Sequence, residues 1–178
     1  MRLFTAIDIP QPVRESIDEV LNRLRPLAKI GWTRTDNLHV TTKFIGEWPE
    51  ERLDQMTQAL REVGKTGAIE IAIRGIGWFP NDRHPRVLWT GVDAGADLKA
   101  LARSIEDAVF AIGVAKEDRD YSPHLTLARI RERVPLEALK RALAPLESNE
   151  FGSFRAGEFY LYLSQGGRYT KLAGFPIA

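Results

Sequence analysis

The 178-residue sequence contains no cysteine. Disulfide bonds and thiolate metal sites are therefore excluded, which is consistent with a reducing compartment. No apolar run approaches the roughly 18 to 20 residues that a membrane-spanning helix needs. The N-terminal segment Met1–Asp8 has the pattern of a strand and not of a signal peptide. We therefore expect a soluble, cytoplasmic protein.

An excess of charge of one sign is also missing, because 25 lysine and arginine residues balance 24 aspartate and glutamate residues. The net charge of +1 excludes a broad basic face, so any contact with nucleic acid must be local. The apolar content of 44% is that of an ordinary globular protein. The length suits one compact domain or two small lobes that share a core.

Histidine is scarce, with three residues in the whole chain, and two of them occur in a repeated motif. The segment NLHVTTKFIGE (37–47) aligns with SPHLTLARIRE (122–132) when His39 is placed on His124. A threonine, an isoleucine and a glutamate then match as well. A single His-x-Thr would carry little information, whereas two copies in similar surroundings indicate a shared task.

The same order of strands and helices is predicted around both motifs from apolar periodicity and turn residues. The first half is predicted to form strands at 3–9, 38–45 and 68–79 and helices at 12–27 and 49–63. The second half is predicted to form strands at 86–92, 124–130, 154–164 and 169–177 and helices at 98–112 and 135–146. The turn-rich segment 77–85 would connect the halves.

This repeat predicts an α+β fold in a single domain, residues 1–178, built from a tandem structural repeat at approximately 1–80 and 86–178. We expect two lobes related by a pseudo-two-fold axis, each with a mainly antiparallel sheet packed by helices. A central cleft would lie between them. The long connections would also allow parallel strand pairs, and the sequence leaves this choice open.

The motif residues are suited to acid–base chemistry on a phosphodiester. Residues i and i+2 of a strand share a face, so Thr41 lies beside His39, and Thr126 beside His124. Across one cleft, a neutral and a protonated imidazole would act as base and acid on opposite sides of a phosphorus atom. The threonine hydroxyls would bind its non-bridging oxygens. This chemistry needs no metal and no cofactor.

Other interpretations remain open at this point. A histidine that occurs alone in a strand is more often structural or exposed, and threonine is common in strands for its shape. Two histidines would also ligate a metal with carboxylates from Asp36, Glu47 or Glu132, but none of these has a familiar ligand spacing. His84 has no counterpart in the other half and is expected in an exposed loop.

Several segments carry a resemblance that covers essentially the whole chain. They are RLFTAIDIP from Arg2, the stretch Trp32–Gly46, PRVLW from Pro85, PHLTLAR from Pro123 and YTKLAGFPI from Tyr169. The chain resembles the two-histidine (2H) phosphoesterases and, more narrowly, the RNA 2′,3′-cyclic phosphodiesterases, also called 2′-5′ RNA ligase-like proteins. The resemblance implies a bilobal monomer that opens RNA-terminal 2′,3′-cyclic phosphates to 2′-phosphates. Some such proteins also join RNA ends through a 2′-5′ linkage without ATP.

The resemblance also implies roles for individual residues. His39 would be the proton donor to the ribose O3′ leaving group, and His124 the proton acceptor from water. Thr41 and Thr126 would bind phosphate oxygens. The pseudo-symmetry of the motifs does not by itself distinguish the acid from the base.

The residues five positions after the histidines, Phe44 and Arg129, would stack on the terminal base and pair with the phosphate. Strict alternation places them on the opposite face, so these roles require a β-bulge after each motif. Otherwise Phe44 would be buried and Arg129 an ordinary surface residue. Lys43 shares the His39 face by alternation and would steer a phosphate or be a solvated edge residue. Thr42 would point to the core, where its hydroxyl needs a backbone acceptor.

Two alternative functions remain open. One is a phosphodiesterase for small cyclic phosphates derived from nucleotides or ADP-ribose, and the other is a non-catalytic nucleotide- or RNA-binding module that keeps the cleft. Both motifs are intact, which favours an enzyme. The expected partners are RNA ends with a 2′,3′-cyclic phosphate or small cyclic nucleotides, bound weakly and with sensitivity to salt.

Overall fold

Two antiparallel sheets and four α-helices make up the computed structural model, which describes residues 1–178. The first sheet has the strand order β3 (His39–Glu47), β1 (Arg2–Asp8), β8 (Glu158–Gln165) and β9 (Arg168–Pro176). The second has the order β2 (Gly31–Trp32), β6 (His124–Arg129), β5 (Val87–Asp93), β4 (Ile69–Phe79) and β7 (Glu150–Ala156). The helices are α1 (Gln11–Leu24), α2 (Leu53–Arg61), α3 (Gly95–Phe110) and α4 (Glu137–Leu143). Every strand pair is antiparallel, so the α+β prediction is confirmed and the parallel alternative is wrong.

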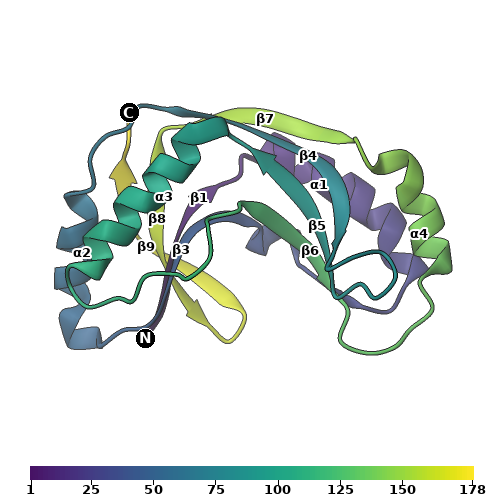
Figure 1. Ribbon diagram of the computed structural model, residues 1–178, viewed down its shortest axis with the longest axis horizontal. Helices are drawn as coiled ribbons and strands as arrows, with labels where there is room; N and C mark the ends of the chain where they lie inside the picture. The colour runs from purple at the N-terminus through teal and green to yellow at the C-terminus, as the bar shows by residue number, and fades with distance from the viewer.

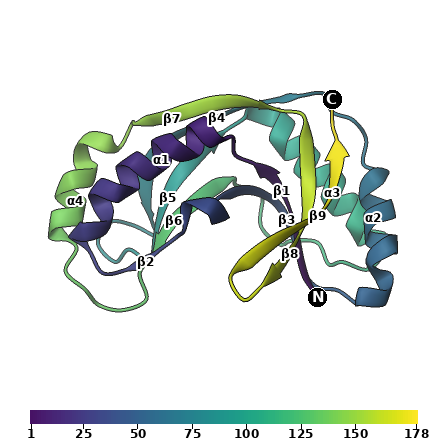
Figure 2. The same cartoon turned by 180° about the vertical axis from the view of Figure 1, so that it is seen from behind.

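Each sheet forms one lobe with two helices, and each lobe takes elements from both halves of the sequence (Figures 1 and 2). The first lobe contains β1, β3, β8 and β9 with α2 and α3; the second contains β2 and β4 to β7 with α1 and α4. Strand β4 of the first half pairs with β5 of the second, and β8 of the second half pairs with β1 of the first. The two lobes therefore do not coincide with the two halves of the sequence: the connection near residues 80–86 separates the two motif copies, not the two lobes.

The segment 154–164, predicted as one strand, is divided between the lobes. Strand β7 ends at Ala156 in the second sheet, and β8 begins at Glu158 in the first, with Gly157 between them. The inward-facing apolar residues are at even positions before Gly157 (Phe154, Ala156) and at odd positions after it (Phe159, Leu161), and the prediction of one strand missed this change of phase. The two-residue strand β2 was also missed, because it is too short to have a period and its partner β6 lies far along the chain.

One hydrophobic cluster of 35 buried residues extends through both lobes. Helix α1 contributes the positions that the sequence pattern placed on one face, and α3 does the same from the other half of the chain. Each such side chain contributes roughly 1.5–3 kcal/mol by leaving water. The shared core thus holds the lobes together beside the motifs. No helix has both the length and the apolar character that crossing a membrane requires.

Buried hydroxyl groups in this core are hydrogen-bonded. The Thr42 hydroxyl lies 2.6 Å from the hydroxyl of Thr5 on the neighbouring strand β1. The Thr90 hydroxyl donates to the Gly75 carbonyl at 2.6 Å. The prediction that Thr42 faces the core is confirmed, but its partner is a side chain and not the backbone acceptor that we expected.

Candidate active site

A β-bulge follows each His-x-Thr motif at the same position. The extra residue is Thr42 in β3 and Leu127 in β6, since neither is paired with a residue on the neighbouring strand. Both are buried, and both are followed by a second buried residue and then an exposed one. The exposed residues are Phe44, at 67% relative exposure, and Arg129. The bulges that their predicted roles require are therefore confirmed.

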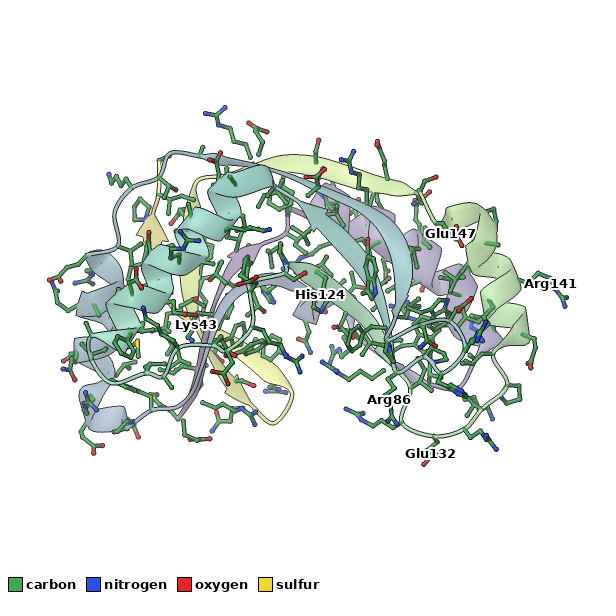
Figure 3. The ribbon with its side chains drawn as sticks, viewed as in Figure 1. Lys43, Arg86, His124, Glu132, Arg141 and Glu147 are labelled. Carbon is green, nitrogen blue, oxygen red and sulfur yellow. The ribbon has the colours of Figure 1, made fainter.

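The first bulge also reverses the direction in which the Lys43 side chain points. This side chain is buried, and its ammonium group lies 3.4 Å from the Glu106 carboxylate of α3 and donates to the Ala115 carbonyl at 3.0 Å. Both expectations, a phosphate-steering residue and a solvated edge residue, are therefore wrong. Lys43 instead connects α3 and the segment after it to the first motif strand. Figure 3 shows Lys43 in the first lobe.

The two motif strands meet at the junction of the lobes (Figure 1). Strand β3 is the edge of the first sheet, and some of its Cα atoms lie within 8 Å of Cα atoms in β6. The Tyr121 hydroxyl, three residues before the second motif, donates to the Thr41 carbonyl at 2.7 Å. His124 accordingly lies between the lobes in Figure 3. The fold thus brings together the two segments that the sequence pairs by similarity.

His39 is enclosed by aromatic side chains and is only 6% exposed. Its ring centroid lies 4.6 Å from that of Tyr162, 5.8 Å from Tyr169 and 6.4 Å from Phe4. Its Nδ1 is 3.1 Å from the carbonyl oxygen of Asn37. Because a carbonyl only accepts, this contact assigns a hydrogen to Nδ1 and leaves Nε2 for proton transfer.

His124 repeats this arrangement in the other motif. Its Nδ1 donates to the carbonyl of Ser122 at 3.0 Å, again two residues earlier in the chain. The two imidazoles therefore share one tautomer, with Nε2 free of a backbone bond. They differ in environment, since His124 is exposed while His39 is enclosed. The two motifs are therefore related by pseudo-symmetry, but their imidazoles differ in exposure to solvent.

Asp8, at the end of β1, is the carboxylate beside His39, with 3.7 Å between its Oδ1 and the Nε2 of the imidazole. It also accepts hydrogen bonds from the Tyr162 hydroxyl and, at 2.6 Å, from the Lys171 ammonium. Burial lowers the pKa of His39, and the bond to Asn37 and the charge of Asp8 partly oppose that effect. Burial raises the pKa of Asp8, but the bonds from Lys171 and Tyr162 outweigh it and hold this pKa below its ordinary value.

Sequence reasoning did not single out Asp8, Tyr162 or Lys171. Asp8 and Lys171 occur in the RLFTAIDIP and YTKLAGFPI segments that carried the family resemblance, which was the available signal. The contact between these two residues spans 163 positions, so no local pattern predicts it.

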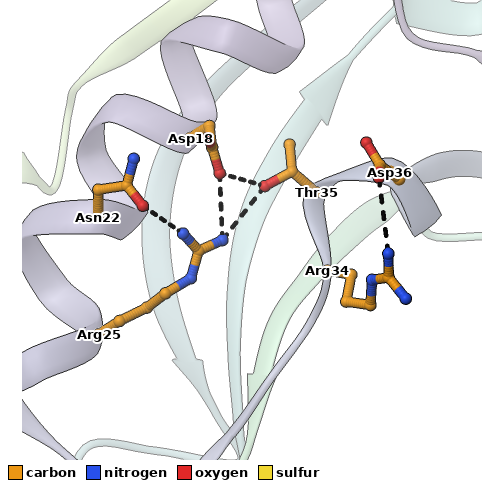
Figure 4. A network of polar contacts seen from close by, with 6 residues as sticks. All are labelled: Asp18, Asn22, Arg25, Arg34, Thr35 and Asp36. Carbon is orange, nitrogen blue, oxygen red and sulfur yellow. Dashed lines mark hydrogen bonds and ion pairs between the residues drawn. The ribbon is translucent and has the colours of Figure 1, made fainter.

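A polar network fixes the turn that precedes His39 (Figure 4). Asp18 of α1 accepts from the Thr35 hydroxyl at 2.6 Å and from Arg25 at 3.2 Å. Thr35 begins the 3₁₀ turn that ends at Asn37, whose carbonyl holds the His39 ring. The hydrogen bond from Thr35 and those from the other donors hold the pKa of Asp18 below its ordinary value. The network thus connects helix α1 to the orientation of the imidazole.

The predicted phosphate-binding groups are free to bind a ligand. The side-chain hydroxyls of Thr41 and Thr126 form no hydrogen bond within the chain, unlike the buried hydroxyls described above. Arg129 is exposed and takes part in none of the ion pairs. It lines a hollow of about 150 Å³ together with Lys29, Arg131 and Glu132. Three cationic side chains and one carboxylate therefore line this hollow, which leaves a local excess of positive charge.

The carboxylates considered as metal ligands do not gather around the two histidines. Glu47 pairs with the N-terminal ammonium at 3.4 Å, and Asp36 with Arg34 at 3.9 Å. Glu132 lies on the outer loop of the second lobe, well away from His124 in Figure 3. No group of three or more histidine, aspartate or glutamate side chains is arranged to hold a metal ion. His84 is exposed in its loop, as expected.

Two lobes of antiparallel sheet, with a His-x-Thr motif from each on strands that meet, define a phosphoesterase of the two-histidine class. The chain belongs to the family of LigT-like phosphoesterases, whose model matches residues 7–89 and 92–169.

Relatives of known name agree with this assignment. The chain is 33% identical to an RNA 2′,3′-cyclic phosphodiesterase of Archaeoglobus fulgidus over 161 residues, 90% of this chain and 89% of that protein. It is 32% identical to a protein of the same name from Methanothermobacter thermautotrophicus over 99% of both chains. The structure of E. coli LigT complexed with 3′-AMP matches with a TM-score of 0.78 at 27% identity, covering 99% of this chain and 97% of that one. A crystal structure of a Thermus thermophilus protein matches with a TM-score of 0.78 at 29% identity, covering 99% of this chain and 98% of that one.

Proposed function

We propose that this protein is an RNA 2′,3′-cyclic phosphodiesterase that hydrolyses a terminal 2′,3′-cyclic phosphate to a 2′-phosphate. The observation that carries the proposal is the pair of motifs itself. Each supplies an imidazole whose Nε2 has no hydrogen bond to the backbone and a threonine hydroxyl with no hydrogen bond within the chain, on strands that meet at the junction of the lobes. The relatives named above support RNA ends as the substrate class.

The reaction needs one proton acceptor and one proton donor on opposite sides of phosphorus. Nε2 of His124 takes a proton from the attacking water as the new O–P bond forms. The P–O3′ bond breaks, and Nε2–H of His39 protonates O3′, so the phosphate stays on O2′. Thr41, Thr126 and Arg129 bind the non-bridging oxygens, where negative charge increases in the transition state.

The position of Phe44 supports His39 as the acid. Phe44 is exposed on the His39 strand, 6.3 Å from Phe4 between ring centroids, and would stack on the terminal base. Stacking there places the terminal ribose on the His39 side, so that O3′ leaves toward this histidine. In the free protein burial lowers the pKa of His39. A bound cyclic phosphate carries a negative charge that favours the imidazolium, so substrate and proton bind together.

The same geometry accounts for the remaining features of the proposal. One chain supplies both imidazoles, both hydroxyls and Arg129, so we propose that the enzyme works as a monomer. The displacement requires proton transfers at both ends and no Lewis acid, so we propose that it proceeds without a metal ion.

The experiment compares an oligoribonucleotide that ends in a 2′,3′-cyclic phosphate with a small cyclic nucleotide, both in the presence of EDTA. The product isomer is identified by ³¹P NMR. His39→Ala and His124→Ala should each lose roughly 100- to 10,000-fold in rate with an unchanged circular dichroism spectrum. His84→Ala, the third histidine of the chain, is the matched control and should keep full activity. Full activity in either motif variant, or a 3′-phosphate product, would contradict the proposal; faster turnover of the small cyclic nucleotide would favour the alternative substrate.

A further inference from the structure

The residue opposite the histidine differs between the two motifs. In the β1–β3 ladder Asp8 is directly opposite His39, and in the β5–β6 ladder Gly91 is directly opposite His124. Residues directly opposite each other project from the same face of a sheet, so a side chain at either position would lie beside the imidazole. Only the first motif has such a side chain, and it is a carboxylate.

The backbone excludes a side chain from the second position. A Cβ placed at Gly91 would lie 2.7 Å from the carbonyl oxygen of Arg74, which is closer than real Cβ atoms come. The repeat does contain a second aspartate, because Asp93 follows Asp8 by the same interval that separates the two histidines. Asp93, however, lies beyond the end of the β5–β6 ladder and pairs with Arg74. No ion pair includes His124.

Asp8 faces the nitrogen of His39 that carries the transferred proton. Its Oδ1 lies 3.7 Å from Nε2, which is within the range of an ion pair but too long for a hydrogen bond. Both carboxylate oxygens already accept hydrogen bonds, Oδ1 from the Tyr162 hydroxyl and Oδ2 from the Lys171 ammonium. The carboxylate therefore stays ionised and stabilises an imidazolium without taking its proton, which remains available to O3′.

Asp8 is the carboxylate that offsets the positive charges around His39. The titratable and charged groups that face this imidazole are Asp8 of β1, Tyr162 of β8, Tyr169 and Lys171 of β9, and Arg14 of α1. Burial lowers the pKa of His39 most, and the two cations lower it further. Asp8 raises this pKa by more than either cation lowers it. Without Asp8, an enclosed imidazolium would therefore face two positive charges and no negative one from this set.

We propose that Asp8 is a positioning residue that keeps the His39 imidazolium ready to protonate the leaving group, and that the absence of a side chain at Gly91 leaves His124 without such a partner, so that two similar motifs act in one direction. The proposal rests on the proposed function. Asp8 stabilises the imidazolium until the P–O3′ bond breaks and Nε2–H passes its proton to O3′. His124 then releases the proton of the attacking water to solvent, and His39 takes one up for the next turnover.

The test replaces the 3′-oxygen of the cyclic phosphate by sulfur. A thiolate leaves near neutral pH without a proton, because thiols are far more acidic than alcohols, so the acid is needed only for the oxygen substrate. On the alkaline limb of the pH profile, Asp8→Asn should lower kcat on the oxygen substrate by about 10-fold or more, since loss of an opposite charge at this distance reduces the imidazolium fraction by that factor. On the sulfur substrate Asp8→Asn and His39→Ala should recover most of the wild-type rate. His124→Ala should lose activity on both substrates.

The pH profile and a double variant separate this role from a structural one. In Asp8→Asn the alkaline limb on the oxygen substrate should move to lower pH, because the His39 imidazolium loses its proton at lower pH. In a His39→Ala background, Asp8→Asn should cause no further loss. Asp93→Asn is the matched control and should keep the wild-type profile on both substrates. Tyr162→Phe removes one donor to Asp8 and keeps the ring, so it should show a smaller loss with the same recovery on sulfur; this variant covers the case in which Asp8→Asn does not fold.

Equal losses on the two substrates, in Asp8→Asn or in Tyr162→Phe, would overturn the positioning role, as would a further loss in the His39→Ala background. Recovery on sulfur by His124→Ala and not by His39→Ala would reverse the direction of the site, overturning the inference while the phosphodiesterase activity stands. A wild-type protein that hydrolyses neither substrate would refute the proposed function itself.

Discussion

The hydroxyl group of Tyr121 connects the two motifs, and its removal tests whether their relative position controls the reaction. Tyr121 precedes His124 by three residues and donates to the Thr41 carbonyl at 2.7 Å. Its ring packs against the main hydrophobic cluster, so Tyr121→Phe removes one hydrogen bond and keeps the packing. The segment between α3 and β6 would then be held to β3 chiefly by Lys43, which bonds to the Ala115 carbonyl.

The size of the effect follows from this contact. Loss of a partly buried hydroxyl–carbonyl bond costs about 1–2 kcal/mol of folding free energy. A loosened segment leaves His124 out of line with His39 for part of the time, and a displacement of about 1 Å can reduce a rate by as much as ~100-fold. We therefore expect kcat to fall about 10-fold, equivalent to ~1.4 kcal/mol in the activation barrier. KM should change little, because Phe44 and Arg129 are untouched.

The assay combines steady-state hydrolysis of a cyclic-phosphate oligonucleotide with urea unfolding. Thr90→Val is the matched control, because Thr90 also donates to a backbone carbonyl at 2.6 Å from a buried position, but within one lobe. Both variants should lose similar stability, and only Tyr121→Phe should lose kcat. If the two variants have the same kcat, the contact between the motifs does not control catalysis and the reasoning is wrong.

Three further outcomes are expected. Asp8→Asn should lower the pKa of His39, because the variant loses the carboxylate that favours the imidazolium and keeps the positive charge of Lys171. NMR titration of the three histidines measures this pKa. The control Asp107→Asn, on the surface of α3, should leave the pKa of His39 unchanged. Thr5→Val and Thr42→Val should each destabilise the fold by about 1–2 kcal/mol, because either replacement leaves the other buried hydroxyl unpaired. The double variant removes both hydroxyls, so its loss of stability should be smaller than the sum of the two single losses. Additive losses in urea unfolding would argue against this pairing. Dialysis against EDTA should not change the hydrolysis rate, and restoration of a lost rate by a divalent metal would exclude the metal-free mechanism.

The motif strands were predictable in unusual detail because their pattern is local and repeated. Strict alternation turns Phe44 and Arg129 away from the face of the histidines, so their expected roles required a bulge after each motif. The strand register confirms both bulges. The same alternation failed for Lys43, because the bulge that returns Phe44 to the exposed face also turns its neighbour inward. The identity of the group that pairs with Lys43 depends on where α3 packs, and no local pattern contains that information.

The sequence by itself determined the number and order of most strands and helices, the duplication of the motif and the residue types available for proton transfer. These follow from periodicity and side-chain chemistry, which act over a few residues. Only the tertiary structure decided that each lobe combines strands from both halves of the sequence, and that Asp8 and Lys171 meet beside His39. These contacts join distant parts of the chain, and packing of the whole core selects them, so short-range preferences do not specify them.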